Sequence, residues 1–495
     1  MTAPAAIRLV CCCFGLALAG QWCGSVQQQQ QQPMPVAQAL AGAPARPQPL
    51  VADQIRQLLD TAVVPGAEAR LGLQAGPDVR AFYGADFIPA WTLATDSVTA
   101  DARAALAQLA RALEHGLRPT DYHWPRLQAL RDSLRRPALP AQHVRQQALL
   151  DVYLSDATLR FMRDLSRGRL QPYAWSGAEK AAGRAWRPAP VLRAALGGGA
   201  VPAAMVAGQP RHREYRQLQQ ALAHWLTLPA PADSVAGRQA QYEQAALNLE
   251  RWRWDALPGD SSYILINIPA YELLVVVHDS VVRRHRVIVG QPRTPTSTLS
   301  SRLTHFTLAP DWHVPRSIAT KEILPRLKVD AGYLARNNYS LYDAGGRYLD
   351  PYRVNWTAVT AQNFRFTIRQ SAGCDNALGN IVFRFANPYS VYLHDTPMRQ
   401  FFERPDRAMS HGCMRLQEPL ALAAYLLRRE GRPVHLPGEA ECARQPTPRD
   451  VRLRRPMPLY VRYATCTAEH GHLQFFPDVY RRDEPLRRAL FGPRS

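Results

Sequence analysis

The chain has 495 residues, enough for two or three domains with a substantial core, and its 46% hydrophobic content is typical of a globular protein. Its formal net charge is +20, and 57 of its 60 basic residues are arginine. Such a charge favours an anionic neighbourhood, and a weak, salt-sensitive attraction to an anionic polymer or membrane surface is expected. The sequence has no nucleic-acid-binding motif, zinc-ligand spacing or basic repeat with interleaved aromatic residues, which argues against a nucleic-acid partner.

Residues 1–24 have the pattern of an export signal. Arg8 precedes an apolar run from Leu9 to Gly20, which is too short for a comfortable membrane span, and Ala17-Leu18-Ala19 fits a cleavage site. Cys23 raises the alternative of lipid attachment, but Gln21-Trp22 fits such a site poorly. No later segment is long and apolar enough to cross a membrane. We therefore expect export to the periplasm or cell envelope, with the signal cleaved or retained as an N-terminal anchor.

Four of the eight cysteines belong to this N-terminal segment, namely Cys11, Cys12, Cys13 and Cys23. The other four are Cys374, Cys413, Cys442 and Cys466. Four scattered cysteines in so long a chain are not a disulfide framework. A bridge between Cys442 and Cys466 stays open, supported only by their proximity in sequence. We interpret Cys374 as an ordinary small residue, with a second exposed thiol as the alternative.

Composition and periodicity divide the first half of the chain. A glutamine run, Gln27–Gln32, opens a Gln/Pro-rich linker over residues 25–50. Residues 51–235 show helical periodicity: apolar residues recur at intervals of three and four in 102–113 and 149–165. Thr99 or Asp101 can cap the first of these helices, and Gly116 can end it. Residues 177–211 are rich in alanine, glycine and proline and predict an irregular connection.

The periodicity changes in the second half. After a connecting helix at 236–257, residues 258–490 predict a β-rich domain. Strands are expected at 263–268, 273–277, 281–289, 364–368, 381–385, 390–394, 458–465 and 473–476, and helices at 318–334 and 419–429. The fold class is therefore an α+β multidomain protein, with a mostly helical N-terminal domain followed by a β-rich domain.

A histidine and a cysteine form the most informative pattern. His394, at the end of a predicted strand, is separated by fifteen residues from Ser410-His411-Gly412-Cys413-Met414-Arg415. A histidine can take the proton of a thiol, and the resulting thiolate attacks a carbonyl to form a thioester. We assign Cys413 as nucleophile and His394 as general base, with a backbone carbonyl near Asp395 orienting the imidazole.

The neighbouring residues fit supporting roles. The N–H groups of Gly412 and Cys413 can stabilise an oxyanion, and Ser410 and His411 can bind the loop together. Arg415 is suited to a substrate carboxylate. Asp395 and Thr396 are also assigned to substrate binding. No metal or cofactor is expected. The alternative is a structural role for both residues, since a lone cysteine or histidine usually has one.

The pattern His-x15-Ser-His-Gly-Cys-x-Arg resembles the signature of the L,D-transpeptidase (YkuD-like) family of peptidoglycan enzymes. Further segments resemble the catalytic domain of its large multidomain branch: Asn267-Ile268-Pro269, Val287-Ile288-Val289-Gly290, Trp312-His313-Val314-Pro315, Lys321-Glu322-Ile323-Leu324-Pro325, Asn376-Ala377-Leu378-Gly379 and Pro477-Asp478-Val479-Tyr480. The helical half resembles that branch's scaffold domain through Phe82-Tyr83, Pro89-Ala90-Trp91, Gly116-Leu117-Arg118-Pro119 and Asp121-Tyr122.

The resemblance implies a scaffold domain, a catalytic domain, and a flap at about 311–385. It also implies a function: Cys413 releases D-Ala from tetrapeptide stems of peptidoglycan and forms 3→3 crosslinks through a thioester. Carbapenem-type β-lactams would acylate the same thiol. The alternatives are an L,D-carboxypeptidase that hydrolyses the thioester, and a non-catalytic wall scaffold protein. The segment from Trp225 to Arg238 is too short for the family's peptidoglycan-binding module, so we expect that module to be absent. We expect a monomer.

Overall fold

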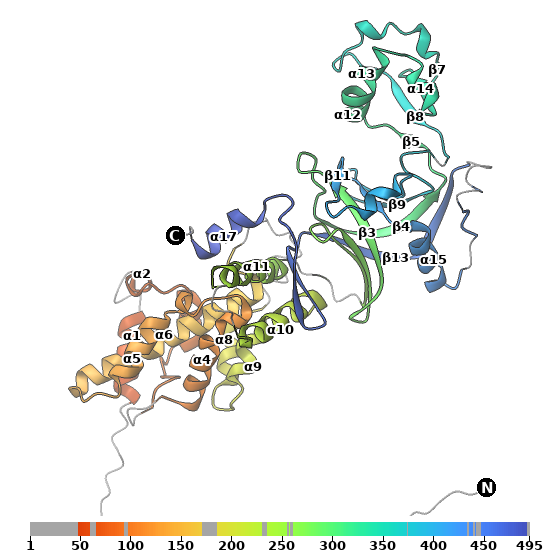
Figure 1. Cartoon of the computed structure of the whole chain (residues 1–495). Coiled ribbons are helices and arrows are strands. Elements are labelled where there is room, and N and C mark those ends of the chain that lie inside the picture. Colours follow the sequence, from red (N-terminus) through yellow and green to blue (C-terminus); the bar gives the residue numbers. More distant parts are fainter. Residues whose placement is uncertain are drawn as a thin grey trace, which may run out of the picture. The chain divides into compact units, whose positions relative to one another are not determined.

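The computed structural model describes residues 48–59, 66–93, 98–170, 186–229, 235–254, 257, 261–373, 375–432, 435–438, 441 and 447–492 (Figure 1). The predicted export signal, the linker up to residue 47, and Cys374 and Cys442 lie outside these residues. Within the described part of the chain, no helix combines the length and hydropathy needed to cross a membrane. The same residues contain no cluster of side chains that could hold a metal ion.

The N-terminal half is helical, as the periodicity predicts. Its helices are α1 (Gln48–Leu59), α2 (Ala67–Leu71), α3 (Gly76–Tyr83), α4 (Ala100–Ala110), η1 (Ala112–His115), η2 (Pro119–Tyr122), α5 (Trp124–Ser133), α6 (Pro140–Arg167), α8 (Pro188–Ala195), α9 (Val201–Val206), α10 (Arg213–Thr227) and α11 (Val235–Trp254). The prediction of an irregular connection over 177–211 was wrong where α8 and α9 form. Both helices carry a proline in the first turn, where its missing N–H costs no hydrogen bond, so prolines here start helices.

Helix α6 is the centre of this half, and a buried carboxylate on it organises a connection. Asp151 accepts hydrogen bonds from the N–H groups of Ala90, Trp91 and Thr92 at 2.9, 2.9 and 3.0 Å. The Tyr83 hydroxyl donates to the same carboxylate at 2.8 Å. Backbone donors in a loop must find acceptors when they are buried, and Asp151 supplies them. The loop after α3 is therefore held against α6 by one fully buried side chain.

The second half is built on a nine-stranded sheet with the order β11-β3-β12-β10-β9-β4-β13-β1-β2, and a further β3–β2 pairing closes it on itself. Its strands are β1 (Ser262–Asn267), β2 (Glu272–Val277), β3 (Ser280–Gly290), β4 (Leu299–Leu308), β9 (Ile381–Phe385), β10 (Leu393–His394), β11 (Ala408–Ser410), β12 (Met414–Leu416) and β13 (Arg449–Arg462). Alternate residues of these strands form one apolar core, against which α15 (Pro419–Arg429) packs. The short segment η7 (Arg399–Glu403) precedes β11.

Strand limits differ from the predictions where polar residues interrupt the apolar pattern. β4 was not predicted, because serine, threonine, arginine and histidine fill its outward positions. β13 begins nine residues before its predicted start, in an arginine-rich stretch where only Val451, Leu453 and Met457 face the core. β10 is shorter than predicted, with two residues. Outward-facing positions carry no apolar signal, so edges of such strands are hard to predict.

An insertion between β4 and β9, here called the flap, has its own small sheet and core (Figure 1). It contains β5 (Trp312–His313), α12 (Arg316–Ile318), η4 (Ala319–Ile323), α13 (Leu324–Leu327), α14 (Tyr333–Arg336), β6 (Tyr339–Tyr342), β7 (Tyr348–Leu349), η5 (Pro351–Arg353), η6 (Trp356–Ala358) and β8 (Thr367–Gln370). Because β9 belongs to the large sheet, the insertion ends before residue 381, not at the predicted 385. The single helix predicted over 318–334 is interrupted; η4 is π-helical.

The helical half and the large sheet share an apolar cluster. Leu218 and Leu222 of α10 and Leu249 of α11 pack with Tyr263 and Val276 of the sheet. The C-terminal elements β14 (Cys466–Glu469), β15 (His472–Phe475) and α17 (Asp483–Phe491) complete this region. This core fixes the position of α10 against two β-hairpins.

Candidate active site

Two neighbouring strands bring the predicted histidine and cysteine together. β10 and β12 are parallel partners in which His394 lies opposite Arg415. One step back, the Met414 N–H donates to the Tyr392 carbonyl at 3.0 Å, so Tyr392 lies beside Cys413. Side chains alternate along a strand, so Tyr392, His394, Cys413 and Arg415 share one face while residues 393 and 414 enter the core.

The loop before Cys413 is held by hydrogen bonds. Ser410 Oγ donates to the Cys413 carbonyl at 2.5 Å and accepts the Gly412 N–H at 3.1 Å. Thr296 Oγ1 donates to the Gly412 carbonyl at 2.8 Å. Gly412 has a φ of +114°, which only glycine adopts readily. Ser410 thus binds the loop as predicted, and the conformation depends on Gly412.

The backbone of β3 approaches this loop closely. A Cβ atom on Gly290 would lie 2.1 Å from the Thr294 carbonyl oxygen and 3.0 Å from the Gly412 Cα. A larger residue at 290 would therefore push the loop that carries Cys413 away from the sheet. The glycine that ends β3 is needed for the site to form.

His394 is buried and oriented by its own chain. Its Nδ1 lies 2.5 Å from the Asp395 carbonyl oxygen, the backbone acceptor that was expected. A carbonyl can only accept, so Nδ1 carries the proton and Nε2 is left free to act as a base. Burial, and then the nearby Arg415 charge, lower the pKa of His394 to about 3. The imidazole is therefore neutral at physiological pH.

Cys413 is a free, half-buried thiol. Burial raises its pKa, while hydrogen bonds from the backbone and hydroxyl of Tyr392 and the charge of Arg415 act in the opposite direction. The Tyr392 hydroxyl also bonds to Trp312 in the flap, and its ring lies 5.5 Å from that of His394. The resting pair is thus a neutral thiol and a neutral imidazole, with donors placed to stabilise the thiolate once it forms.

Arg415 is the cation of the site. Burial lowers its pKa, and the neighbouring Cys413 partly offsets this. Among the described residues, no hydrogen bond or ion pair engages its guanidinium. An unpaired, half-buried guanidinium is suited to a planar carboxylate, which it can bind through two parallel hydrogen bonds.

Three residues, Gly412, Asp395 and Thr396, make hydrogen bonds that differ from the roles expected from the sequence. The Gly412 N–H is already donated to Ser410 Oγ, so it is not available to an oxyanion. The Asp395 carboxylate is buried and accepts the Asn380 N–H at 2.9 Å. Thr396 is also buried, and its hydroxyl accepts the Met398 N–H at 3.2 Å. The side chains of Asp395 and Thr396 therefore hold the strand end in place, and their assignment to substrate binding stays a prediction.

His411 contacts the flap, not its own loop. Its Nε2 lies 2.6 Å from Glu322 Oε1 in the π-helical segment η4. Isolated π-helical turns are common at functional sites. His411, two residues before Cys413, thus joins the loop that carries Cys413 to the flap.

Sequence reasoning did not assign Tyr392, Trp312 or Glu322 to the site. A signal for Tyr392 was present: residue 392 is two positions before His394, so strand alternation places both on one face. No such local signal exists for Trp312 and Glu322, which arrive from the flap.

The other described cysteine has no role here. Cys466 is buried and free, and burial raises its pKa far above the usual range. Cys442, the other partner of the bridge that the sequence left open, lies outside the described residues.

Known proteins resemble both halves of the chain. Residues 77–222 match the model of the Scaffold domain, and residues 261–436 match the model of the L,D-transpeptidase (YkuD) catalytic domain. A Haemophilus influenzae protein named "Putative L,D-transpeptidase" is 32% identical over 247 residues, or 50% of this chain and 49% of that protein. The chain thus spans about half the length of this relative.

A solved structure was also found. It is an L,D-transpeptidase from Mycobacterium smegmatis, with 16% identity and a TM-score of 0.21, covering 41% of this chain and 59% of that one. So limited a superposition carries no argument about this chain.

Proposed function

We propose that the chain is a member of the L,D-transpeptidase family, with a Scaffold domain ahead of its catalytic domain, and that it forms 3→3 crosslinks in peptidoglycan through a thioester on Cys413. The observation that carries the proposal is the shared face of β10 and β12. There His394, with Nδ1 held by a carbonyl and Nε2 free, lies with a thiol and an unpaired cation.

In the first half-reaction, His394 Nε2 takes the Cys413 proton as sulfur attacks the carbonyl that precedes terminal D-Ala in a tetrapeptide stem. The tetrahedral oxyanion would be stabilised by the Cys413 N–H and the Tyr392 hydroxyl. When the intermediate collapses, the C–N bond breaks and the imidazolium returns its proton to the D-Ala amine. D-Ala leaves, and a thioester remains on Cys413.

In the second half-reaction, the side-chain amine of a diamino acid in a neighbouring stem attacks the thioester. His394 takes a proton from this amine, the C–S bond breaks, and the thiol is regenerated. The product is an amide between two third-position residues. A flap that covers the acceptor side would exclude water, which otherwise yields the hydrolysed stem.

Arg415 gives this site a preference for anionic substrates. Stem peptides carry carboxylates close to the reacting carbonyl, and the unpaired guanidinium lies on the same face as the thiol. A carboxylate bound there would offset the cost of keeping Arg415 half-buried and place the carbonyl over sulfur.

Mass spectrometry of the full chain with a carbapenem tests the nucleophile. One adduct is expected on wild type and on Cys466→Ala, and none on Cys413→Ala. Incubation with tetrapeptide muropeptides then tests the reaction. Crosslinked dimer with released D-Ala supports transpeptidation; tripeptide alone identifies a hydrolase instead. Absence of an adduct from the wild type would leave a non-catalytic wall protein as the remaining reading.

A further inference from the structure

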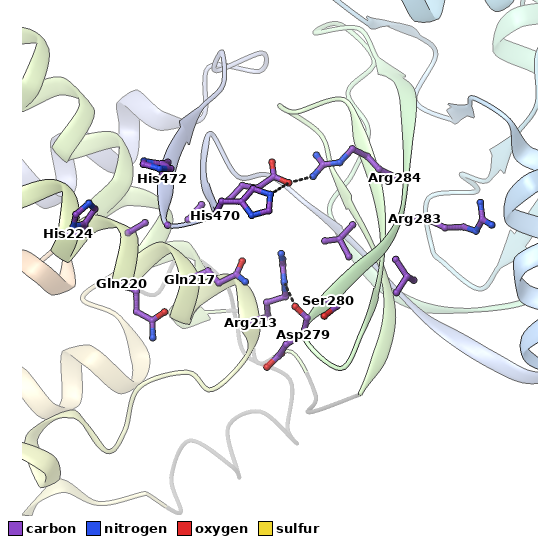
Figure 2. Close-up of a pocket in the computed structure, with 16 residues that line it drawn as sticks. Arg213, Gln217, Gln220, His224, Asp279, Ser280, Arg283, Arg284, His470 and His472 are labelled. Carbon is purple, nitrogen blue, oxygen red and sulfur yellow. Dashed lines mark hydrogen bonds and ion pairs between the residues drawn. The ribbon is translucent and has the colours of Figure 1, made fainter.

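A large polar cavity lies between the helical half and the two β-hairpins. Its volume is about 840 Å³, and its walls come from α10, the β2–β3 turn and the β14–β15 turn (Figure 2). A smaller cavity of about 220 Å³ shares Arg213 and Gln217 with it and adds the aromatic side chains of Trp252 and Phe476. Cavities of this size hold small molecules or short polymer segments.

The cavity presents neutral polar groups without internal partners. Within the described part of the chain, the side chains of Gln217, Gln220, His224, Ser280 and His472 make no hydrogen bond to protein. Gln217 Oε1 is buried as well as unpartnered. A buried, unsatisfied acceptor is costly unless a ligand or water binds it. Figure 2 shows Gln217 on α10 projecting toward the hairpin that carries His470, whereas the Gln220 side chain points away from that hairpin.

Most charged groups of the cavity have partners within the protein: Arg213 lies 3.6 Å from Glu214, and Asp279 pairs with Arg216 at 2.5 Å. Arg213 Nε donates to the Asp279 carbonyl at 2.8 Å. Arg284 binds Glu469 at 2.5 Å and Glu272 at 2.7 Å. Arg283 lies on the other side of β3, over a ring of α15 (Figure 2). Free amide, imidazole and hydroxyl groups around neutralised charges suit a ligand of hydroxyls and amides, not an ion.

We propose that this cavity binds a neutral glycan segment bearing hydroxyl and acetamide groups, about two sugar rings long. The occupant would be the glycan strand of the polymer whose stems Cys413 attacks, so this proposal rests on the proposed function. The free side chains of Gln217, Gln220 and His472 match hydroxyls and acetamides, and Phe476 gives the smaller cavity an apolar wall.

The cavity is separate from the reactive thiol. β3 begins with Ser280 at the cavity and ends with Gly290 beside the catalytic loop. A strand rises about 3.3 Å per residue, so its ends are about 30 Å apart. A bound glycan strand would hold the polymer while a stem some distance along it reaches Cys413. It would give this chain a wall contact at the boundary of its own two halves.

A neutral β-1,4-linked tetrasaccharide of N-acetylglucosamine is a suitable probe, because it has hydroxyls and acetamides but no stem peptide. Calorimetric titration of the full chain should show saturable binding, and cellotetraose, which lacks acetamides, should bind at least about tenfold more weakly. Gln217→Ala/His472→Ala should weaken tetrasaccharide binding by about tenfold. Gln220→Trp, a change at an exposed position on the rim, should weaken it similarly by filling the cavity.

The reaction at Cys413 provides an independent readout. Both variants should react with a carbapenem at the wild-type rate, and Cys413→Ala should bind the tetrasaccharide normally. No saturable binding by the wild type overturns the glycan proposal, and so does unchanged binding by both cavity variants. Failure of carbapenem acylation, with glycan binding intact, would instead overturn the proposed function.

Discussion

Glu322 Oε1 lies 2.6 Å from His411 Nε2, which joins the flap to the catalytic loop two residues before Cys413. The side chains of Glu322 and His411 are 51% and 45% exposed, so the contact stabilises the flap against the loop that carries Cys413 by at most about 1 kcal/mol. We expect the flap of the Glu322→Gln variant to separate more often from the loop that carries Cys413. Amide hydrogen exchange across residues 312–370 should accelerate by up to about fivefold, with the large sheet unchanged.

Glu403→Gln is the matched control. It removes a similarly exposed ion pair, Arg286–Glu403 at 2.7 Å, which lies outside the flap. Exchange in the flap should be unaffected by this change. If Glu322→Gln and Glu403→Gln altered the flap equally, or if neither did, the contact with His411 would not hold it.

Much of the fold, but not all of it, could be predicted from the sequence. Helical periodicity and strand-like runs predicted both halves and the elements with a clear apolar pattern. Short strands such as β5, β6, β7, β11 and β12 were not predicted. The prolines at 188 and 202 suggested irregular structure, yet they start helices. β4 escaped notice because its register is set by its partners β9 and β13, a long-range property that no local pattern carries.

In the candidate site too, local patterns predicted some residues, whereas contacts between distant segments could not be predicted. His394, Cys413 and the Asp395 carbonyl are close in sequence or on adjacent strands, so spacing and motif predicted them. The Gly412 N–H was assigned to an oxyanion, but Ser410 Oγ competes for it, and such competition depends on the loop's conformation. Trp312 reaches the site through the flap's docking, which cannot be inferred from neighbours along the chain.

Tyr392 connects the flap to Cys413, since its hydroxyl bonds to both Trp312 and Cys413. We expect Tyr392→Phe to lower the rate of carbapenem acylation by about 10- to 100-fold, because one donor to the thiolate and oxyanion is lost. Trp312→Phe should have a smaller effect in the same direction. Tyr342→Phe, a change elsewhere in the flap, is the control. Stopped-flow fluorescence measures all three, and a wild-type rate for Tyr392→Phe would remove the hydroxyl from the mechanism.

Asp151 should be a stability determinant of the helical half. Asp151→Ala leaves the buried N–H groups of residues 90–92 without an acceptor and should lower the free energy of unfolding by about 3–5 kcal/mol. Asp132→Ala, at an exposed position on α5, should cost less than about 0.5 kcal/mol. Urea denaturation followed by circular dichroism measures both. Similar values for the two variants would show that the loop does not depend on Asp151.

Arg415 should set the acid limit of the reaction. Burial is the largest influence on both groups: it lowers the pKa of His394 and raises that of Cys413, and the charge of Arg415 lowers both. With a pKa of about 3, His394 remains an active base down to roughly pH 4, so wild-type acylation should show no loss near pH 6.5. Arg415→Met should raise the pKa of His394 and move the acid limb upward. Arg415→Lys keeps the charge and should move it less. Measuring the acylation rate between pH 3.5 and 8 tests this shift. If the rates of Arg415→Met and wild type fell at the same acidic pH, the prediction would be contradicted.

The same lowered pKa makes stability depend on pH. An unfolded histidine binds a proton below about pH 6.5, whereas folded His394 binds one only near pH 3, so the unfolded state holds more protons between these values. Stability should therefore rise with pH across this window and fall as pH drops through it, by at most about 1.4 kcal/mol per pH unit from this residue. His394→Gln should flatten the dependence. Some slope should remain, because burial and Arg253 also lower the pKa of His115, to about 4. Urea denaturation at pH 4.5 and 7.5 compares the variants, and an unchanged slope in His394→Gln would mean that the imidazole is not buried in the neutral form.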